Sequence, residues 1–206
     1  KEPQTAKKSA AATTGNSAPK AAPKAKAAGF QKTAADDLRQ ERYGNGNNKS
    51  EGYIRRDAND NFVRVGEWKF WFRNGTLKEK GSYVGGKKQG LWEKWHRNGQ
   101  KESELRYKAD QDHGKFIKWR RNGQVSESGA HTDGQKSGLW KKWYRKGAQL
   151  EYEGTYANGQ KDGKWTHWFK KGQKKSQIEY KAGVKDGMAK EWFRSGQAKS
   201  EGTYRG

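Results

Sequence analysis

The chain of 206 residues contains no cysteine, so it can form no disulfide bond, no thiolate nucleophile and no cysteine-based metal site. It also lacks any run of about eighteen apolar residues, and we therefore expect no transmembrane helix. Hydrophobic residues make up 30% of the chain and charged residues 33%. This composition argues against a large conventional core, because few aliphatic side chains are present to build one.

Aromatic residues, in contrast, are abundant and recur at a fixed interval. They make up 13% of the chain and include ten tryptophans, a content that argues against disorder throughout. A glycine-led aromatic motif begins at Gly66, Gly90, Gly114, Gly138, Gly163 and Gly187, in steps of 24, 24, 24, 25 and 24 residues. A period of this length predicts a stacked array in which each unit buries its aromatics against its neighbours.

The tryptophans fall into two columns of the repeat. The inner column is unbroken and consists of Trp71, Trp95, Trp119, Trp143, Trp168 and Trp192. The outer column consists of Trp68, Trp92, Phe116, Trp140 and Trp165, and it ends at Ala189. Their strict register predicts that the ten tryptophans form a structural spine holding the repeats together, rather than a stacking surface for a ligand.

Two turn signals in each repeat predict its fold. The first is an Arg-Asn-Gly sequence such as Arg97-Asn98-Gly99, and Asn-Gly between aromatic-rich stretches is the strongest short-range signal for a β-hairpin. The second is a link such as Asn158-Gly159, in which glycine supplies the positive φ of a tight turn. Alternating strands and tight turns predict an all-β fold, an elongated antiparallel β-hairpin meander of about six 24-residue repeats.

The parity of the aromatic positions predicts where their rings point. Trp68 and Trp71 are three residues apart, so they face opposite sides of a regular strand unless a bulge brings both columns to one side. A glycine column made of Gly81, Gly129, Gly154 and Gly202 lies on the second strand of the repeat, and Leu105 and Ile178 interrupt it. The missing side chains leave room for a large ring to lie over the backbone.

The chain divides into four parts. Residues 1–32 are rich in Ala, Lys and Pro, and we predict a disordered basic tail because they bury too little apolar surface to offset their ordering entropy. Residues 33–49 predict a short helix, with Thr33 as its N-cap, followed by a linker. Residues 50–65 predict a hairpin that caps the array. Residues 66–206 hold six repeats, at 66–89, 90–113, 114–137, 138–162, 163–186 and 187–206.

Most of the positive charge belongs to the repeats. The formal net charge is +22, and residues 1–42 contribute about +5 of it, from nine Lys/Arg and four Asp/Glu. The remaining charge, about +17, favours an anionic partner: nucleic acid, an anionic membrane, an acidic glycan or an acidic protein. The alternative is that Lys and Arg only keep a thin, two-sided sheet soluble.

Two sets of basic residues recur at fixed positions and are the candidate binding residues. The first set lies two residues before each hairpin glycine and consists of Arg73, Arg97, Arg121, Arg145, Lys170 and Arg194. The second set consists of Lys88, Lys136, Lys161 and Lys185 and is interrupted by Asp112. Stacked hairpins would align each set in a row along one edge, with neighbours about 10 Å apart, a spacing suited to an anionic polymer. The alternative is a solvated edge that prevents aggregation.

Residues suited to catalysis or metal binding are few. Of the four histidines, His96 and His131 occupy aromatic positions of the repeat, and no pair has metal-ligand spacing. No serine lies in a nucleophile-elbow motif, and the glycine-rich links lack the phosphate-binding pattern. The recurring carboxylates Glu51, Glu104, Glu153 and Glu201 are more typical of cross-strand partners for Lys and Arg. We therefore predict no catalytic residue, no metal site, no cofactor and no small-molecule substrate.

The repeat resembles a known family. Its Gly-x-Trp-x-x-Trp-x-x-Asn-Gly-Gln core, its Glu-Gly-Thr-Tyr ending and its Asn-Gly-Gln-Lys-Asp-Gly link are similar to MORN repeats, in particular to the bacterial variant of YwqK-family antitoxins. The resemblance covers residues 50–206 and departs at Ala189, where the last copy loses its outer aromatic. It implies an elongated β-hairpin array used for attachment to proteins or membranes, without a catalytic site.

These observations predict a non-enzymatic scaffold that presents a basic β surface to a protein partner. Two alternatives remain open, a binder of nucleic acid, anionic lipid or acidic glycan through its basic rows, and an antitoxin that binds a toxin protein. The first residue is Lys rather than Met, and together with the tail this favours an exported protein of a bacterial cell envelope.

Overall fold

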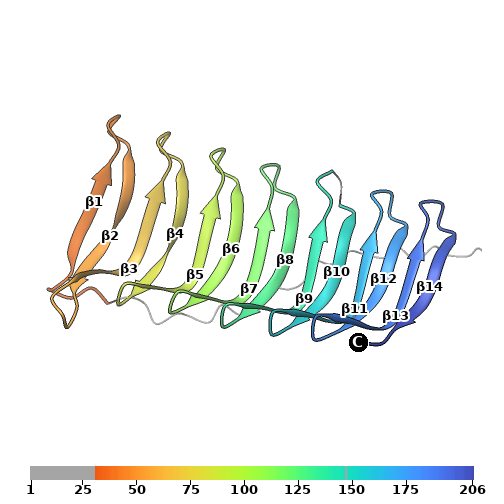
Figure 1. Cartoon of the computed structure of the whole chain (residues 1–206). Helices are drawn as coiled ribbons and strands as arrows, with labels where there is room; N and C mark the ends of the chain where they lie inside the picture. Colours follow the sequence, from red (N-terminus) through yellow and green to blue (C-terminus); the bar gives the residue numbers. More distant parts are fainter. Residues whose placement is uncertain (1–30, 147) are drawn as a thin grey trace, which may run out of the picture.

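The computed structural model describes residues 31–146 and 148–206, which form one open antiparallel β-sheet. Its fourteen strands follow one another in chain order, each hydrogen-bonded to the next (Figure 1). The predicted all-β hairpin meander is therefore confirmed. The predicted disordered tail falls on residues 1–32, of which residues 1–30 lie outside the described residues.

The strands alternate regularly along the array. They are β1 (Asp37–Arg42), β2 (Asn48–Arg56), β3 (Phe62–Trp71), β4 (Leu77–Val84), β5 (Lys87–Trp95), β6 (Lys101–Lys108), β7 (Gln111–Trp119), β8 (Val125–Thr132), β9 (Gln135–Trp143), β10 (Leu150–Ala157), β11 (Gln160–Trp168), β12 (Lys174–Lys181), β13 (Val184–Trp192) and β14 (Ala198–Tyr204). Each repeat contributes one odd-numbered and one even-numbered strand, and the glycine that begins a repeat lies inside its odd-numbered strand.

The two kinds of turn lie at opposite ends of the strands. We call one end of the strands the hairpin tips. Three-residue turns there join β3 to β4, β5 to β6, β7 to β8, β11 to β12 and β13 to β14. In the first of these, Gly75 has φ 84° and donates its N–H to the Phe72 carbonyl at 2.9 Å. At the other end, two-residue turns such as Asn158-Gly159, with φ 49° and 77°, return the chain to the next odd strand. Both turn signals of the sequence are confirmed.

A bulge in each of the strands β3, β5, β9 and β11 places the outer tryptophan over the preceding strand. In β5 the pairs Lys80↔Glu93 and Ser82↔Gln89 leave three residues of β5 opposite the single residue Gly81 of β4. The Trp92 ring then lies over Gly81 so closely that a Cβ at that position would overlap the ring. Its indole N–H donates to the Ser82 carbonyl at 3.2 Å. The room that the glycine column was predicted to leave is thus filled by the outer tryptophan.

The buried core of the array is built from these outer rings. Trp92, Trp140 and Trp165 are each 1% exposed and Trp68 is 4% exposed. Tyrosines of the even strands separate them, since the Tyr83 ring meets the Trp92 ring edge-on at 4.9 Å and Tyr156 meets Trp165 in the same way. The core is therefore a linear stack along the sheet between Trp68 on β3 and Trp165 on β11.

Two repeats fill the same space with different side chains. Where Leu105 replaces the glycine, it pairs with Phe116, which replaces the outer tryptophan. Where Ile178 replaces the glycine, it pairs with Ala189. The larger residue on the even strand is thus matched by a smaller one on the next odd strand, which explains why the glycine and tryptophan columns are interrupted together.

The inner tryptophans lie on the opposite face of the sheet and are only half-buried. The rings of Trp68 and Phe70 stack on one face of the sheet, with their centres 5.8 Å apart. Side chains alternate along a strand, so Trp71, the next residue after Phe70, points to the opposite face. The bulge precedes Trp68 and leaves this alternation unchanged. On the inner face, the Lys101 ammonium lies 6.0 Å from both the Trp95 and Trp119 rings. The two columns therefore form one ladder on each face, as their spacing predicts, and only the outer ladder is a buried core.

The helix predicted within residues 33–49 is wrong. Residues 37–42 form strand β1, which pairs with β2 through Leu38↔Tyr53 and Arg39↔Gly52. Leu38 is the only apolar side chain of this segment, so a helix would have almost nothing to bury. The strand instead pairs with the edge of β2, and Tyr43–Asn47 makes a turn with the same hydrogen bonds as the later hairpin tips. The array therefore begins one hairpin earlier than the predicted cap at residues 50–65.

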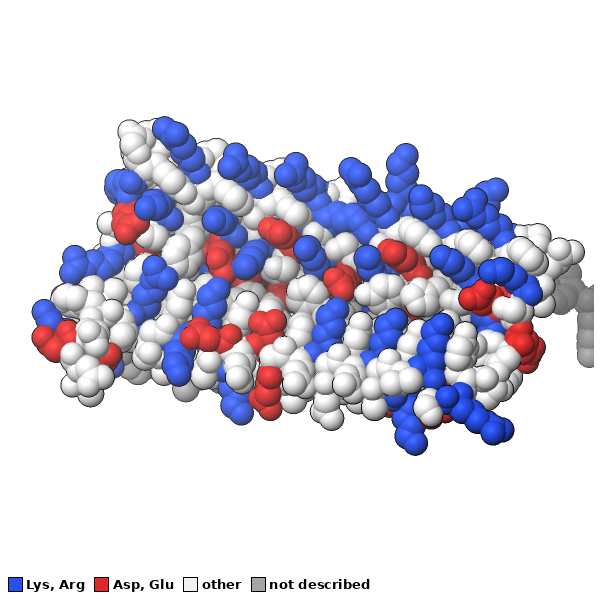
Figure 2. All heavy atoms as spheres, in the orientation of Figure 1, with Lys and Arg blue, Asp and Glu red and all other residues white. Residues whose placement is uncertain are grey.

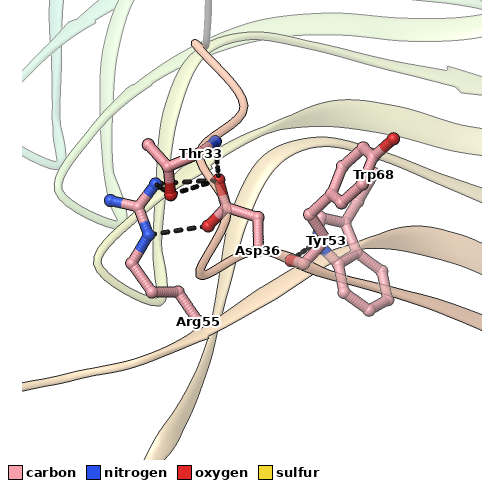
Figure 3. A network of polar contacts seen from close by, with 5 residues as sticks. All are labelled: Thr33, Asp36, Tyr53, Arg55 and Trp68. Carbon is pink, nitrogen blue, oxygen red and sulfur yellow. Dashed lines mark hydrogen bonds and ion pairs between the residues drawn. The ribbon is translucent and has the colours of Figure 1, made fainter.

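Thr33 and Asp36 fasten the chain just before β1 (Figure 3). The Asp36 carboxylate is fully buried and accepts two hydrogen bonds from the Arg55 guanidinium, at 2.7 and 2.9 Å. It also accepts the N–H of Thr33 at 2.7 Å. These bonds hold the pKa of Asp36 well below its usual range, with the Arg55 hydrogen bonds as the main cause. Thr33 therefore does not cap a helix; it serves a polar clamp on β2.

Candidate binding surface along the hairpin tips

All six residues of the first predicted basic row lie at the hairpin tips and are exposed. They are Arg73, Arg97, Arg121, Arg145, Lys170 and Arg194, and we call them the tip row. Figure 2 shows basic side chains along this upper edge of the array. Within residues 31–146 and 148–206, none of the six side chains forms an ion pair with a carboxylate. The tip row therefore presents uncompensated positive charge.

Hydrogen bonds between successive turns keep several of the tips in register. Asn74 donates its amide N–H to the Arg97 carbonyl at 3.3 Å, and Asn98 donates to the Arg121 carbonyl at 2.9 Å. Below the turns, the Tyr144 hydroxyl donates to the Trp168 carbonyl at 2.7 Å. These bonds were not predicted from the sequence, although the recurrence of Asn in the turn is the signal that could have shown them.

Aromatic rings lie beside the tip row at intervals. The Arg97 guanidinium carbon is 5.5 Å from the centre of the Phe72 ring, and that of Arg194 is 5.8 Å from the Phe169 ring. Each arginine thus rests on a ring of the preceding repeat, a contact that favours a charged guanidinium without neutralising it.

A hollow of about 490 Å³ opens at the tips of the last three repeats. It is lined by two aromatic rings, one glutamine and four basic residues: Tyr144, Phe169, Gln173, Lys170, Lys171, Lys175 and Arg194. No acidic residue lines it. Burial, together with the charge of Glu151, raises the pKa of Tyr144, so its hydroxyl stays protonated at neutral pH and retains its hydrogen bond to the Trp168 carbonyl.

The second predicted row lies near the opposite ends of the strands, but three of its four lysines are half-buried over the outer rings. The Lys88 ammonium lies 3.9 Å from the centre of the Trp92 ring and 2.9 Å from Glu79. Lys136 lies 3.8 Å from Trp140 and pairs with Glu127 at 3.5 Å.

Lys161 and Lys185 differ from the other two lysines of this row. Lys161 covers Trp165 at 4.4 Å, and burial, together with the charge of Lys185, lowers its pKa. Lys185 is exposed beside Tyr204 at 4.8 Å. Lys88, Lys136 and Lys161 therefore cover the aromatic core, and the role of this row in binding stays a prediction.

The second row begins with an arginine that was not predicted from the sequence. Arg64 lies on β3 with its guanidinium carbon 4.6 Å from the Trp68 ring, and it donates to the Tyr83 hydroxyl at 3.3 Å. It occupies the place that lysine takes in later repeats, so a search for Arg as well as Lys at this position would have found it.

Asp112 interrupts the second row for a structural reason. The ring that faces it from β8 is His131 rather than tyrosine, and the two side chains approach to 3.9 Å. His131 packs edge-on against Phe116 and Trp140. Burial lowers the pKa of His131, although the Asp112 carboxylate opposes that effect. Asp112 thus places a carboxylate beside His131, which already has the charge of Lys136 on its other side.

Within residues 31–146 and 148–206, no three His, Asp or Glu side chains gather as a metal site would require. The same part of the chain has no helix long and apolar enough to span a bilayer. Of the recurring carboxylates, Glu153 and Glu201 form cross-strand pairs, with Lys141 at 3.3 Å and with Lys190 at 2.6 Å.

The single-layer sheet and its basic tip row define a β-hairpin repeat protein, whose stacked units offer one extended surface. Residues 64–84, 88–109 and 161–182 match the family model of the MORN repeat variant. Such repeats generally serve as non-catalytic modules that contact proteins or membranes. No curated protein matches the chain.

Proposed function

We propose that the protein is a non-enzymatic scaffold that binds an acidic protein partner along the tip row. The observation that carries this proposal is the exposure of all six basic residues without a carboxylate partner in the described part of the chain. Elsewhere on the sheet, many lysines are paired with glutamate, as Lys88 is with Glu79. Charge left uncompensated in an aligned row attracts an anionic surface and accelerates association with it.

The spacing of the tip row fits an elongated partner. Two strands separate successive tips, so neighbouring charges lie about 10 Å apart, which is close to the Debye length at physiological salt. The row therefore acts partly as one extended charge. A partner without net negative charge along the length of the tip row would gain little binding free energy from the row. An antitoxin that covers an acidic toxin is one finer form of the same proposal.

A second candidate function is binding of a single-stranded nucleic acid. The hollow at the last three tips supports it, because Tyr144 and Phe169 lie among four basic residues there. Proteins that bind single strands combine a basic path for the phosphates with aromatic rings on which bases stack. Either function is compatible with the proposed location in a bacterial cell envelope. Only the composition of residues 1–32 supports that location.

Binding to three anionic probes would test the proposal. The full chain is titrated with a poly-glutamate peptide, a single-stranded oligonucleotide and anionic vesicles at about 50 and about 200 mM salt. Replacing Arg97, Arg121 and Arg145 by Gln is expected to weaken binding to poly-glutamate and to reduce the steepness of its salt dependence. For the oligonucleotide, the slope of log K against log salt is negative, and the loss of three contacts should reduce its magnitude by about 2.

A matched control removes the same charge elsewhere. Lys115, Lys164 and Lys181 are exposed and lie away from the tips, so their replacement by Gln changes the net charge equally but spares the tip row. The proposal fails if both triple variants lose the same affinity, or if the unmodified chain binds none of the probes at the lower salt. Preference for the oligonucleotide over poly-glutamate would favour the second candidate function.

A further inference from the structure

The hollow of about 490 Å³ at the tips of the last three repeats, which we call the tip hollow, is centred on the fifth repeat. The fourth repeat contributes Tyr144 to it and the sixth contributes Arg194, while the other five lining residues belong to the fifth. Within residues 31–146 and 148–206, none of its four basic side chains forms an ion pair with a carboxylate. The tip hollow therefore gathers four uncompensated positive charges.

Two lysines of the tip hollow stand where other repeats carry different residues. At the position of Lys171 the first three repeats carry asparagine, as at Asn98, whose amide donates to the carbonyl of the next tip. At the position of Lys175 the second and fourth repeats carry Glu102 and Glu151. The fifth repeat thus lacks both the bridging amide and the carboxylate, and it has a positive charge in each place.

The Phe169 ring also differs from its counterpart in the fourth repeat. There the Tyr144 hydroxyl donates to the carbonyl of the next inner tryptophan, Trp168. Phe169 has no polar atom and makes no such bond to the carbonyl of Trp192. Its ring is half-buried and lies 5.8 Å from the guanidinium carbon of Arg194. An aromatic surface that is not needed for a bridge between tips therefore lies among the four charges.

We propose that the tip hollow binds a nucleotide with two or three linked phosphate groups. Linked phosphates carry several negative charges within a short distance, and Lys and Arg are the side chains that bind them. The base lies against Phe169, since aromatic side chains stack on any base. The volume falls within the range of about 300–1,000 Å³ typical of small-molecule sites. The inference rests on the same hollow as the second candidate function, but it requires only a single nucleotide.

Calorimetric titration of the full chain with adenosine triphosphate (ATP), in EDTA and at about 100 mM salt, tests the proposal. We expect one binding site per chain. Inorganic tripolyphosphate is the matched ligand because it has a similar charge and no base. ATP should bind at least about fivefold more tightly than tripolyphosphate, the smallest gain expected from stacking one base on an aromatic ring.

Two substitutions taken from other repeats make the test specific to the tip hollow. Lys171→Asn and Lys175→Glu introduce residues that the same positions carry elsewhere in the array, so the chain should still fold. Together they should weaken ATP binding at least about tenfold, because two charged contacts are lost. The matched control is Lys115→Asn with Lys181→Glu, which changes the net charge equally at exposed positions away from the tips. It should bind ATP nearly as the unmodified chain does.

The second repeat offers the converse experiment. It already has the remaining elements of the hollow, namely a preceding ring, a glutamine in the turn, and arginine at its own tip and the next: Phe72, Gln100, Arg97 and Arg121. The substitutions His96→Phe, Asn98→Lys and Glu102→Lys supply the rest. They should therefore raise the number of ATP molecules bound per chain from one to two.

Four results would overturn the proposal. They are no binding at about 1 mM ATP, equal affinity for ATP and tripolyphosphate, equal loss in the lysine pair and its control, and an unchanged stoichiometry in the second-repeat variant. A chain that binds the oligonucleotide but not ATP would overturn this inference and leave the second candidate function standing.

The proposed function of the tip row can fail or succeed separately. The variant at Lys171 and Lys175 keeps all six residues of the tip row. The variant with Gln at Arg97, Arg121 and Arg145 keeps every residue of the tip hollow and should bind ATP normally. Loss of ATP binding and loss of poly-glutamate binding therefore identify different surfaces.

Discussion

At the scale of single residues, the stability of the array depends on pairs whose sizes are complementary. A glycine on the even strand is matched by tryptophan, leucine by phenylalanine, and isoleucine by alanine. Each pair fills one space between two neighbouring strands, so neither member can change alone without overlap or a cavity. The residues that look like departures from the repeat are therefore substitutions made together.

Exchange of one such pair for another tests this complementarity. Gly154→Leu alone should destabilise the chain by about 1–3 kcal/mol or more, because the new side chain overlaps the Trp165 ring. Adding Trp165→Phe should restore part of that loss, since the pair then matches Leu105 and Phe116. A coupling free energy of about 0.5–3 kcal/mol is expected from a double-mutant cycle measured by urea unfolding.

The open glycine provides the control for this cycle. Gly202→Leu introduces the same side chain where no atom lies within 4 Å, so it should change the free energy of unfolding by no more than about 0.5 kcal/mol. Additive effects of the two changes at Gly154 and Trp165 would contradict the pairing.

At the scale of elements, each strand is held by its two neighbours, and the first strand needs a special device. Strand β1 pairs only with β2 and all its side chains are exposed. The buried Asp36 carboxylate joined to Arg55 fastens the residues before it onto β2. In an array where each unit contacts only adjacent units, such a contact stabilises its own end more than the remainder.

The clamp should make the first hairpin sensitive to acid. Because the folded-state pKa of Asp36 lies below its usual range, the stabilisation is fully present above the unfolded pKa of about 3.9 and is lost as pH falls below it. At about pH 3, the amides of β1 and β2 should exchange faster than expected from their protection at neutral pH and the pH dependence of intrinsic exchange. Amides of β7 to β10 should change less.

Asp36→Asn should remove this acid sensitivity, since the amide does not titrate, and it should speed exchange of β1 amides at neutral pH. Glu41 also pairs across β1 and β2, with Lys49 at 2.9 Å, but both side chains are largely exposed. Glu41→Gln is therefore the matched control and should have little effect. If it abolishes the acid sensitivity as Asp36→Asn does, the clamp is not its source.

At the scale of the whole molecule, most of the net charge of +22 lies on a sheet without a thick core. Ion pairs on its faces offset part of the repulsion, but the tip row has no carboxylate partner in the described part of the chain. Neighbouring charges about 10 Å apart in water repel each other by about 0.4 kcal/mol per pair before screening. The tip row therefore opposes folding slightly.

Salt should stabilise the array by screening this repulsion. The thermal midpoint of unfolding is expected to rise between low and physiological ionic strength. The variant with Gln in place of Arg97, Arg121 and Arg145 should be at least as stable as the unmodified chain at low salt and should respond less to added salt. Lower stability of this variant in circular dichroism melts would instead show that the row is structural.

The period and the turn signals were enough to predict the strand order, because tight turns every dozen or so residues leave a meander as the simplest connection. The columns Gly-x-Trp and Arg-Asn-Gly likewise located the packing positions and the tip row by register alone. The first strand was not predicted, because the polar composition of residues 37–42 is compatible with either a helix end or an edge strand. Only pairing with β2 selects between them.

The sequence by itself therefore determined the repeat, the sheet and the rows of basic residues, all of which follow from local turns and a fixed period. Only the tertiary structure decided which basic row is available for contact. Lys88 and its counterparts turn over the aromatic core, whereas the tip row stays in solvent. The direction in which a long side chain folds depends on the rings and carboxylates that neighbouring strands bring beside it, and those neighbours are absent from any single repeat.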